Sequence, residues 1–165
     1  AGAAQAILIP EIPFDVDKVA AKVRARDSEG RMYSIVVVAE GAEPVDGHRA
    51  ILAPAEIGHA ERLGGVGDRI GRALAERTGK DVRVVVLGHL LRGGSPTSFD
   101  RLAAMRFGSA AVRALDEGQS GIMVALGFPN VNYVALEEVA GRMKGVPLDS
   151  DTVQTGRDLG ICFGD

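Results

Sequence analysis

Short runs of aliphatic residues alternate with longer segments of helical periodicity along most of this 165-residue chain. Strands that alternate with helices favour a parallel sheet with right-handed crossovers. Only 4% of the residues are aromatic, so the core must be built from Val, Ile, Leu and Ala, which suits a buried parallel sheet. We therefore predict an α/β fold with a three-layer, Rossmann-like parallel sheet. The predicted strands are 6–9, 34–39, 83–87 and 122–126, and the predicted helices are 15–27, 60–78 and 96–117.

The remaining segments show weaker patterns. Turn residues without a clear period predict a surface loop at 41–58, and Gly79 and Gly118 are predicted to end the helices before them. The glycines of 65–71 resemble a dinucleotide fingerprint only superficially, because the last spacing is one residue too long and no strand precedes them. We interpret that segment as a loop that leads into a helix. The C-terminal part predicts a turn, a short strand, a short helix and a final helical segment, at 127–130, 131–135, 136–142 and 151–157.

The charge and cysteine content exclude several classes of function. Nineteen basic and 22 acidic residues give a net charge of −3, which provides no general attraction to nucleic acid. The sequence has no apolar run of membrane-spanning length and no signal-peptide pattern, so we expect no membrane partner and a cytoplasmic location. Cys162 is the single cysteine, and no Cys/His spacing typical of zinc sites occurs.

One stretch combines an anion-binding backbone with charged side chains. The predicted strand 83–87 is followed by His89 and Arg92, then by Gly93-Gly94, and Ser95-Pro96 is predicted to open the next helix. The first N–H groups of a helix are unpaired and its dipole favours negative charge, while a guanidinium binds phosphate or carboxylate in bidentate fashion. This stretch therefore predicts an anion site, although His89 alone is also compatible with a structural role.

Asp100, in the first turn of the same predicted helix, is assigned to structure rather than to ligand binding. An acid at this position stabilises the helix dipole and can complete a cap with Thr97. It can also hold Arg101 or Arg106 in place. The charge of Asp100 is therefore expected to serve the helix.

In open α/β sheets, ligands gather at the carboxyl ends of the strands. Glu11 follows the first predicted strand and Glu40 follows the second, at the edge that also carries His89 and Arg92. Carboxylates accept hydrogen bonds from sugar hydroxyls, and His and Arg bind phosphate, so this edge suits a phosphorylated, polyhydroxylated ligand. The alternative is that each polar residue only marks where a strand leaves the core, and for Glu40 we favour that alternative.

Three separated segments of the chain match motifs of one enzyme family in the expected order. Gly88-His89-Leu90-Leu91-Arg92-Gly93-Gly94-Ser95-Pro96, followed by Phe99-Asp100-Arg101, resembles the hexose-phosphate loop of the 6-phosphofructokinases. Ile9-Pro10-Glu11 and 35–41 resemble two other segments of that family. The resemblance implies that 1–126 is an α/β portion that binds fructose 6-phosphate, in the C-terminal domain of a phosphofructokinase-like fold. It also implies that 127–165 is an extension packed on the same domain or on an N-terminal domain.

The resemblance implies a role for each matching residue. Glu11 matches the glutamate that contacts the sugar of fructose 6-phosphate. His89 and Arg92 match residues that bind the same substrate, with Arg92 near the transferring phosphoryl group as a candidate transition-state stabiliser. Arg83 matches an arginine that reaches the 6-phosphate bound in a neighbouring subunit, which implies a homo-oligomer, commonly a homotetramer. The implied substrate-binding residues are Glu11, Arg83, His89, Leu90, Leu91 and Arg92.

The family motifs that carry the chemistry are missing from this sequence. Family members have a glycine-rich phosphoryl-donor loop, a segment whose aspartate is the catalytic base, and a Met-Gly-Arg motif, none of which occurs here. The resemblance thus implies a C-terminal fragment of a glycolytic enzyme that uses ATP or pyrophosphate as donor, with Mg²⁺ bound mainly through the missing half. We expect no catalysis by this chain alone, because it lacks a general base for the sugar hydroxyl.

Two other hypotheses remain open from the sequence. One is a non-catalytic sugar-phosphate or anion-binding module that regulates a partner and keeps His89 and Arg92. The other is a folding unit whose loop binds only adventitious sulfate or phosphate. An upstream donor loop and base would favour the enzyme, and titration of fructose 6-phosphate against the wild type and Arg92→Ala would identify the adventitious case.

Overall fold

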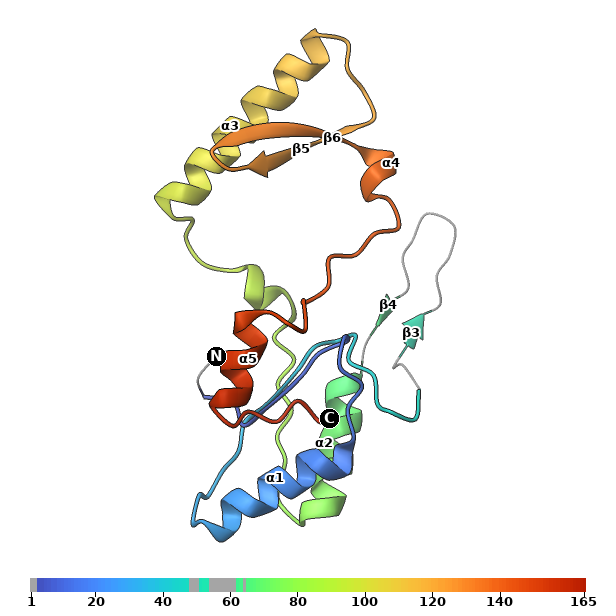
Figure 1. The fold of residues 1–165 in the computed structure, drawn as a ribbon, viewed down its shortest axis with the longest axis vertical. Helices are drawn as coiled ribbons and strands as arrows, with labels where there is room; N and C mark the ends of the chain where they lie inside the picture. The colour runs from blue at the N-terminus through green and yellow to red at the C-terminus, as the bar shows by residue number, and fades with distance from the viewer. Residues whose placement is uncertain (1–2, 48–50, 54–61, 64) are drawn as a thin grey trace. The chain divides into compact units, whose positions relative to one another are not determined.

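The computed structural model describes residues 3–47, 51–53, 62–63 and 65–165. The chain divides into two units, which are drawn with their helices and strands in Figure 1. The first unit comprises Ala1–Val86 and Gly145–Asp165, and the second comprises Leu87–Lys144. Each unit is described by itself. The domain boundary expected after residue 126 stays a prediction.

The order of strands and helices confirms the predicted α/β class. None of the helices within the described ranges is long and apolar enough to cross a membrane. In the first unit, β1, α1, β2, β3, β4, α2 and α5 comprise Ala6–Leu8, Val16–Ser28, Val36–Val38, Ile51–Ala53, Arg62–Leu63, Val66–Thr78 and Asp151–Asp158. In the second unit, the 3₁₀ helix η1 and then α3, β5, β6 and α4 comprise Gly88–Arg92, Ser98–Asp116, Ile122–Gly127, Asn130–Ala135 and Leu136–Val139.

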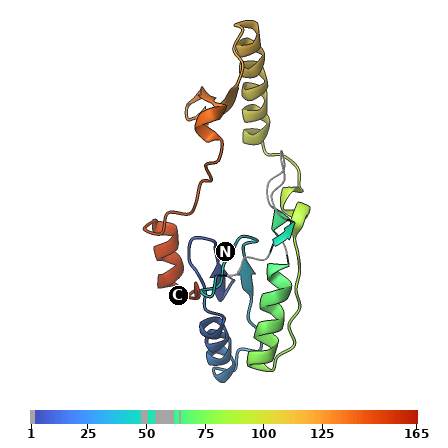
Figure 2. The same cartoon turned by 90° about the vertical axis from the view of Figure 1, so that its right-hand side faces the viewer.

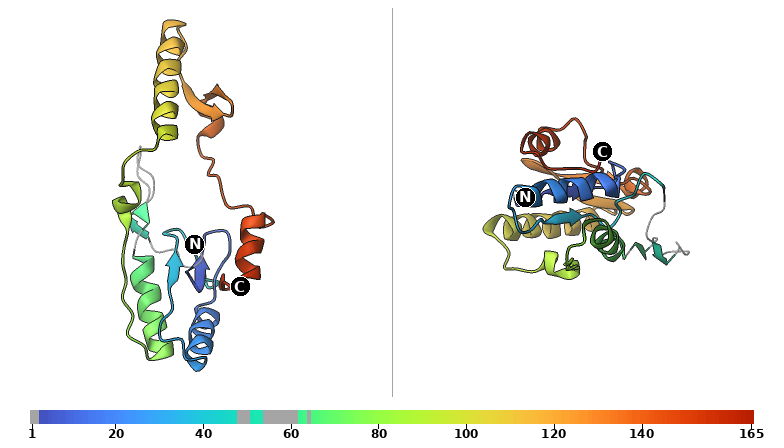
Figure 3. Two further views of the ribbon diagram at one scale, coloured as in Figure 1. Left: turned by 90° about the vertical axis from the view of Figure 1, so that its left-hand side faces the viewer. Right: turned by 90° about the horizontal axis from the view of Figure 1, so that it is seen from below.

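The predicted parallel pairing is present between β1 and β2, with α1 as the crossover. Leu8 lies opposite Val38, and on the other side of β1 Ala6 forms a parallel bridge with Cys162. Alternate side chains of β1 face opposite layers. Leu8 packs toward α1 and α2, whereas Ile7 packs with the cluster that contains Val153 of α5. Figure 2 and the left view of Figure 3 show the two strands between α2 and α5.

Large aliphatic side chains form the core of the first unit. Leu8 and Val19 are completely buried, and Ile70 of α2 belongs to the same cluster. The two helices that cover this face are also joined at their surface, where Arg77 Nε donates to Asp17 Oδ1 at 2.6 Å. Burial of this kind is the main favourable contribution to folding, so this cluster holds β1, α1 and α2 together.

The helix α2 begins later than predicted. Strand β4 occupies 62–63, where the periodicity predicts helix, and Gly65 adopts a left-handed conformation with φ 77°. A left-handed residue cannot continue a right-handed helix, so α2 starts at Val66 and 65–71 is mostly helix rather than loop. The helix stops at a left-handed Gly79, as predicted. The predicted loop 41–58 contains β3, and its residues 48–50 and 54–58 lie outside the described residues.

The prediction of a strand at 83–87 is wrong. These residues are irregular, Val85 and Val86 are 74% and 78% exposed, and no strand in the described ranges pairs with them. A strand exists only when a neighbouring backbone takes up its hydrogen bonds. Val84 instead packs on α2, where a Cβ on Gly71 would lie 2.6 Å from the Val84 Cγ2. The apolar pattern therefore predicts neither the strand nor the burial of this segment, whose residues are all exposed.

In the second unit, α3 packs against a hairpin of β5 and β6. The predicted strand 122–126 is confirmed as β5, but it pairs antiparallel with β6 instead of joining the parallel sheet. Tyr133 of β6 donates a hydrogen bond to the Ala110 carbonyl at 3.0 Å, and Arg106 donates to the Pro129 carbonyl in the turn. The helix ends before a left-handed Gly118, as predicted. Among the described residues of this unit, only Ala110 and Ala114 are buried.

The C-terminal elements follow the predicted order with one shortened helix. The helix α4 ends at Val139 instead of 142, and α5 confirms the final helical segment. Arg157 of α5 donates two hydrogen bonds to the Asp165 carboxylate and lies over the Phe163 ring, 5.2 Å from its centroid. These contacts hold Phe163 and Asp165 against α5.

Candidate functional site

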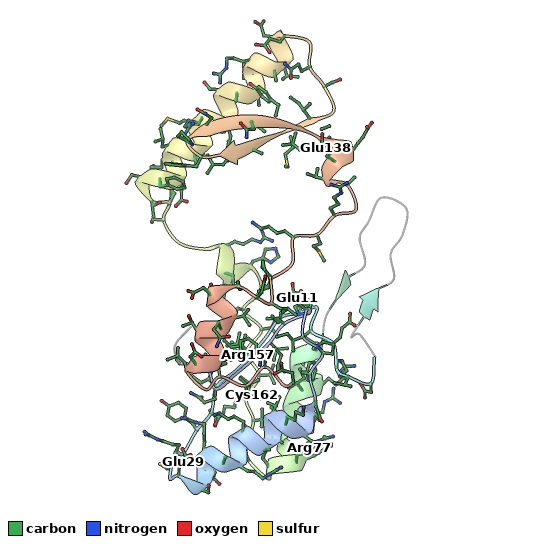
Figure 4. All side chains as sticks on the ribbon, viewed as in Figure 1. Glu11, Glu29, Arg77, Glu138, Arg157 and Cys162 are labelled. Carbon is green, nitrogen blue, oxygen red and sulfur yellow. The ribbon has the colours of Figure 1, made fainter. Side chains whose placement is uncertain are left out.

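Glu11 lies in the turn that directly follows β1, and Figure 4 labels it. The Val146 N–H donates a hydrogen bond to Glu11 Oε1 at 2.8 Å. The second oxygen, Oε2, is buried and has no hydrogen-bond partner among the described residues. A buried carboxylate oxygen without a donor is costly, so this atom is suited to a ligand that supplies a hydroxyl or another donor.

Glu40 follows β2 at the same edge of the sheet as Glu11. Leu8 and Val38, the last residues of β1 and β2, are paired in parallel register, and the Ala39 N–H donates to the Leu8 carbonyl at 2.9 Å. Parallel strands end at one edge, so the two glutamates follow neighbouring strand ends. Glu40 is exposed. The two glutamates therefore follow strand ends at one edge of the sheet, and Glu11 has the more enclosed environment of the two.

Arg83 lies on the irregular segment that follows α2. Its Nε is 3.5 Å from Asp81 Oδ2, and both side chains are more than four-fifths exposed. An ion pair this exposed and this long contributes little to stability. The guanidinium of Arg83 is therefore held only weakly within its own unit.

The loop of the second unit places His89 and Arg92 in η1. Residues three apart in a 3₁₀ helix lie above one another, so these two cationic side chains share one side of η1. Leu90 and Leu91 are exposed to 76% and 75%, and the Gly93 N–H closes the turn on the Leu90 carbonyl at 3.1 Å. The local fold therefore presents the His89 and Arg92 side chains together.

Residues at the start of α3 cap its N-terminus. The prediction that Pro96 is the first residue of this helix is wrong, because α3 begins at Ser98. Thr97 is the N-cap; its hydroxyl oxygen accepts from the Asp100 N–H at 3.2 Å, and Asp100 Oδ2 accepts from the Thr97 N–H at 2.8 Å. Hydrogen bonds from the Thr97 hydroxyl and then its N–H lower the pKa of Asp100. The structural role predicted for Asp100 is confirmed, whereas Arg106 contacts Pro129 instead.

The predicted site residues fall on both units. Glu11, Glu40 and Arg83 belong to the first, and His89 to Arg92 belong to the second. The sequence reasoning missed Val146, because its contact with Glu11 joins positions 135 residues apart and uses a backbone group that every residue except proline has. In the described part of the chain, no three His, Cys, Asp or Glu side chains gather as a metal site.

Comparison with known proteins identifies the family. Residues 1–115 match the phosphofructokinase family. The chain belongs to this family. All of its predicted substrate-binding residues lie within the matched range. Beyond residue 115 the chain continues through the hairpin of β5 and β6, α4 and α5.

Individual phosphofructokinases resemble most or all of the chain. It is 52% identical over 165 residues to the ATP-dependent 6-phosphofructokinase of Chloroflexus aggregans, covering 100% of this chain and 45% of that protein. It is 45% identical over 151 residues to the pyrophosphate–fructose 6-phosphate 1-phosphotransferase of Amycolatopsis mediterranei, covering 90% and 44%. The crystal structure of the pyrophosphate-dependent phosphofructokinase from Nitrosospira multiformis superposes with a TM-score of 0.65 at 25% identity, covering 97% and 41%. The chain therefore spans less than half the length of these relatives.

Proposed function

We propose that the complete protein containing this chain is a 6-phosphofructokinase of glycolysis, which acts in the cytoplasm. It transfers a phosphoryl group from ATP or pyrophosphate to the 1-hydroxyl of fructose 6-phosphate. The observation that carries this proposal is the 52% identity, over the whole chain, to an ATP-dependent 6-phosphofructokinase. The similarity to a pyrophosphate-using enzyme keeps both donors in the proposal.

In this proposal the present chain binds the sugar phosphate. Glu11 accepts a hydrogen bond from a sugar hydroxyl through Oε2, the buried oxygen that lacks a partner among the described residues. His89 and Arg92 bind the same substrate, with Leu90 and Leu91 between them in the loop. Arg92 lies close to the transferring phosphoryl group. Phosphoryl transfer depends mainly on positioning and on stabilising negative charge, which these residues supply.

Arg83 has a separate role in the proposal, which is to bind the 6-phosphate held by a neighbouring subunit of a homotetramer. Its ion pair with Asp81 is exposed and 3.5 Å long, so little stabilisation is lost when the guanidinium turns to another anion. An arginine–phosphate pair is charge-assisted and frequently bidentate, and it is stronger than the pair it replaces. This difference in strength supports an exchange of partners when the substrate binds.

The catalytic base and the donor site belong to the rest of the protein in this proposal, as does Mg²⁺. The described residues do not gather as a metal site, so no step of the reaction is assigned to a metal on this chain. The isolated chain is therefore expected to bind fructose 6-phosphate without turning it over.

The test is to express the complete protein and to assay fructose 6-phosphate phosphorylation with ATP and with pyrophosphate. Arg92→Ala lowers kcat/KM at least about tenfold, the effect of about 1.4 kcal/mol on a charge-assisted phosphate contact. Arg113→Ala, in the last turn of α3, is the matched control and retains activity. Tight binding of fructose 6-phosphate without turnover by either donor would favour the regulatory module. Absence of both binding and turnover would overturn the proposal.

A further inference from the structure

We propose that the Gly145-Val146 backbone is a positioning element for Glu11, which sets the direction of its carboxylate toward the sugar. The inference rests on the proposed function, because that function gives Glu11 a substrate. The Val146 N–H holds Oε1 at 2.8 Å, and Oε2 is buried without a partner among the described residues. One oxygen of the carboxylate is therefore held by the protein, and the other is left for a ligand.

The hydrogen bond from Val146 restricts rotation of the Glu11 carboxylate about the last torsion of its side chain. The last torsion of a glutamate side chain is broad, so a carboxylate that is free at both oxygens samples many orientations. A hydrogen bond to an ionised acceptor is roughly twice as strong as a neutral one. A carboxylate that is already oriented need not be ordered when the substrate binds, so the entropy saved appears as affinity.

Gly145 leaves the space that this hydrogen bond requires. A Cβ on Gly145 would lie 3.0 Å from Glu11 Oε1 and 3.5 Å from its Cγ. The shorter distance is tighter than an ordinary contact, so the glutamate side chain would have to move. Gly145 is not among the glycines with positive φ, so glycine is needed here for space and not for backbone conformation.

The alternative is a hydrogen bond that only anchors the chain where it returns to the first unit at Gly145. An anchoring role predicts a loss of stability when the bond is removed, with no selective effect on one substrate. A positioning role predicts a change in the KM for the sugar phosphate and none in the KM for the phosphoryl donor. The two roles are therefore separated by enzyme kinetics.

The first test compares two substitutions at Val146 in the complete enzyme. Val146→Pro removes the N–H, and Val146→Ala shortens the same side chain and keeps the N–H. The proline variant raises the KM for fructose 6-phosphate about tenfold, as expected for a lost hydrogen bond to a charged acceptor. In the proline variant, kcat and the KM for the phosphoryl donor stay within about twofold of the wild type, because the substitution does not alter the site of the phosphoryl donor. In the alanine variant every kinetic constant stays within about twofold, because the N–H is kept.

The second test asks whether the effect passes through the glutamate. In a Glu11→Ala background, Val146→Pro has no further effect on the KM for fructose 6-phosphate, because the acceptor is gone. Gly145→Ala raises this KM in the wild-type background, because its Cβ would displace the Glu11 side chain from the Val146 N–H. Loss of Tm without a change in KM would instead show an anchoring role.

The outcomes separate the two proposals. If the wild-type enzyme neither binds nor phosphorylates fructose 6-phosphate, the proposed function fails, and the positioning role fails with it. If the wild type is active and Val146→Pro matches Val146→Ala, the positioning role fails alone. It also fails alone if the effect of Val146→Pro persists after Glu11→Ala.

Discussion

The two units of this chain are stabilised in different ways. The first buries large aliphatic side chains, including Leu8 and Val19, between a parallel strand pair and its helices. The second, within its described residues, buries only Ala110 and Ala114, and leaves Met105, Val112 and Leu115 of α3 exposed. Its regularity comes instead from a capping box and a hairpin. Local signals can therefore define an element even where little apolar surface is buried.

The largest expected effect tests the core of the first unit. Leu8→Ala lowers the free energy of unfolding of the chain by about 3 kcal/mol, because it removes buried methyl groups and leaves a cavity. Leu115→Ala is the matched control in the second unit, where the leucine is 72% exposed, and it changes the same quantity by less than about 0.5 kcal/mol. Urea unfolding curves measure both values. Equal losses for the two leucines would contradict the contrast between the units.

A smaller effect tests the local signal of the second unit. Thr97→Ala removes the N-cap of α3 and costs about 1 kcal/mol, because the Asp100 N–H loses its acceptor. Hydrogen exchange speeds up in the first turn of α3, while the amides of β1 keep their protection. Thr97→Ser keeps the hydroxyl and is the control. Unchanged exchange in Thr97→Ala would mean that packing rather than capping defines this helix start.

The smallest effect is a pH dependence shared by both units. The pKa of Asp100 is lowered by Thr97, and the pKa of Asp165 is lowered by the hydrogen bond from Arg157. A lowered folded-state pKa gives stability that is present above the unfolded value near 3.8 and is lost as the pH falls through the folded value. Stability therefore decreases below about pH 4, and Asp100→Asn or Asp165→Asn each flattens that decrease. Thermal unfolding measured from about pH 6 downward through the acid range follows this decrease. An unchanged profile in both variants would contradict the assignment.

Part of the candidate site could be predicted from the sequence, because some of its signals are local. The position of Glu11 follows from where β1 ends, whereas His89 and Arg92 were expected in a loop and lie in the short helix η1. The bond that orients Glu11 could not be predicted, since it joins the side chain to a backbone N–H of the distant Val146. The pairing of β5 with β6 instead of with the parallel sheet was equally outside the reach of a periodicity argument.

Elements whose causes lie within a few residues of one another can be predicted from the amino-acid sequence. These include the ends of two helices at Gly79 and Gly118, the cap formed by Thr97 and Asp100, and the α/β alternation. Which apolar runs become strands depends on the tertiary fold, because a strand needs the backbone of a neighbour and 83–87 has none among the described residues. Only the tertiary structure placed the Val146 N–H against Glu11, because that contact depends on the path of the whole chain.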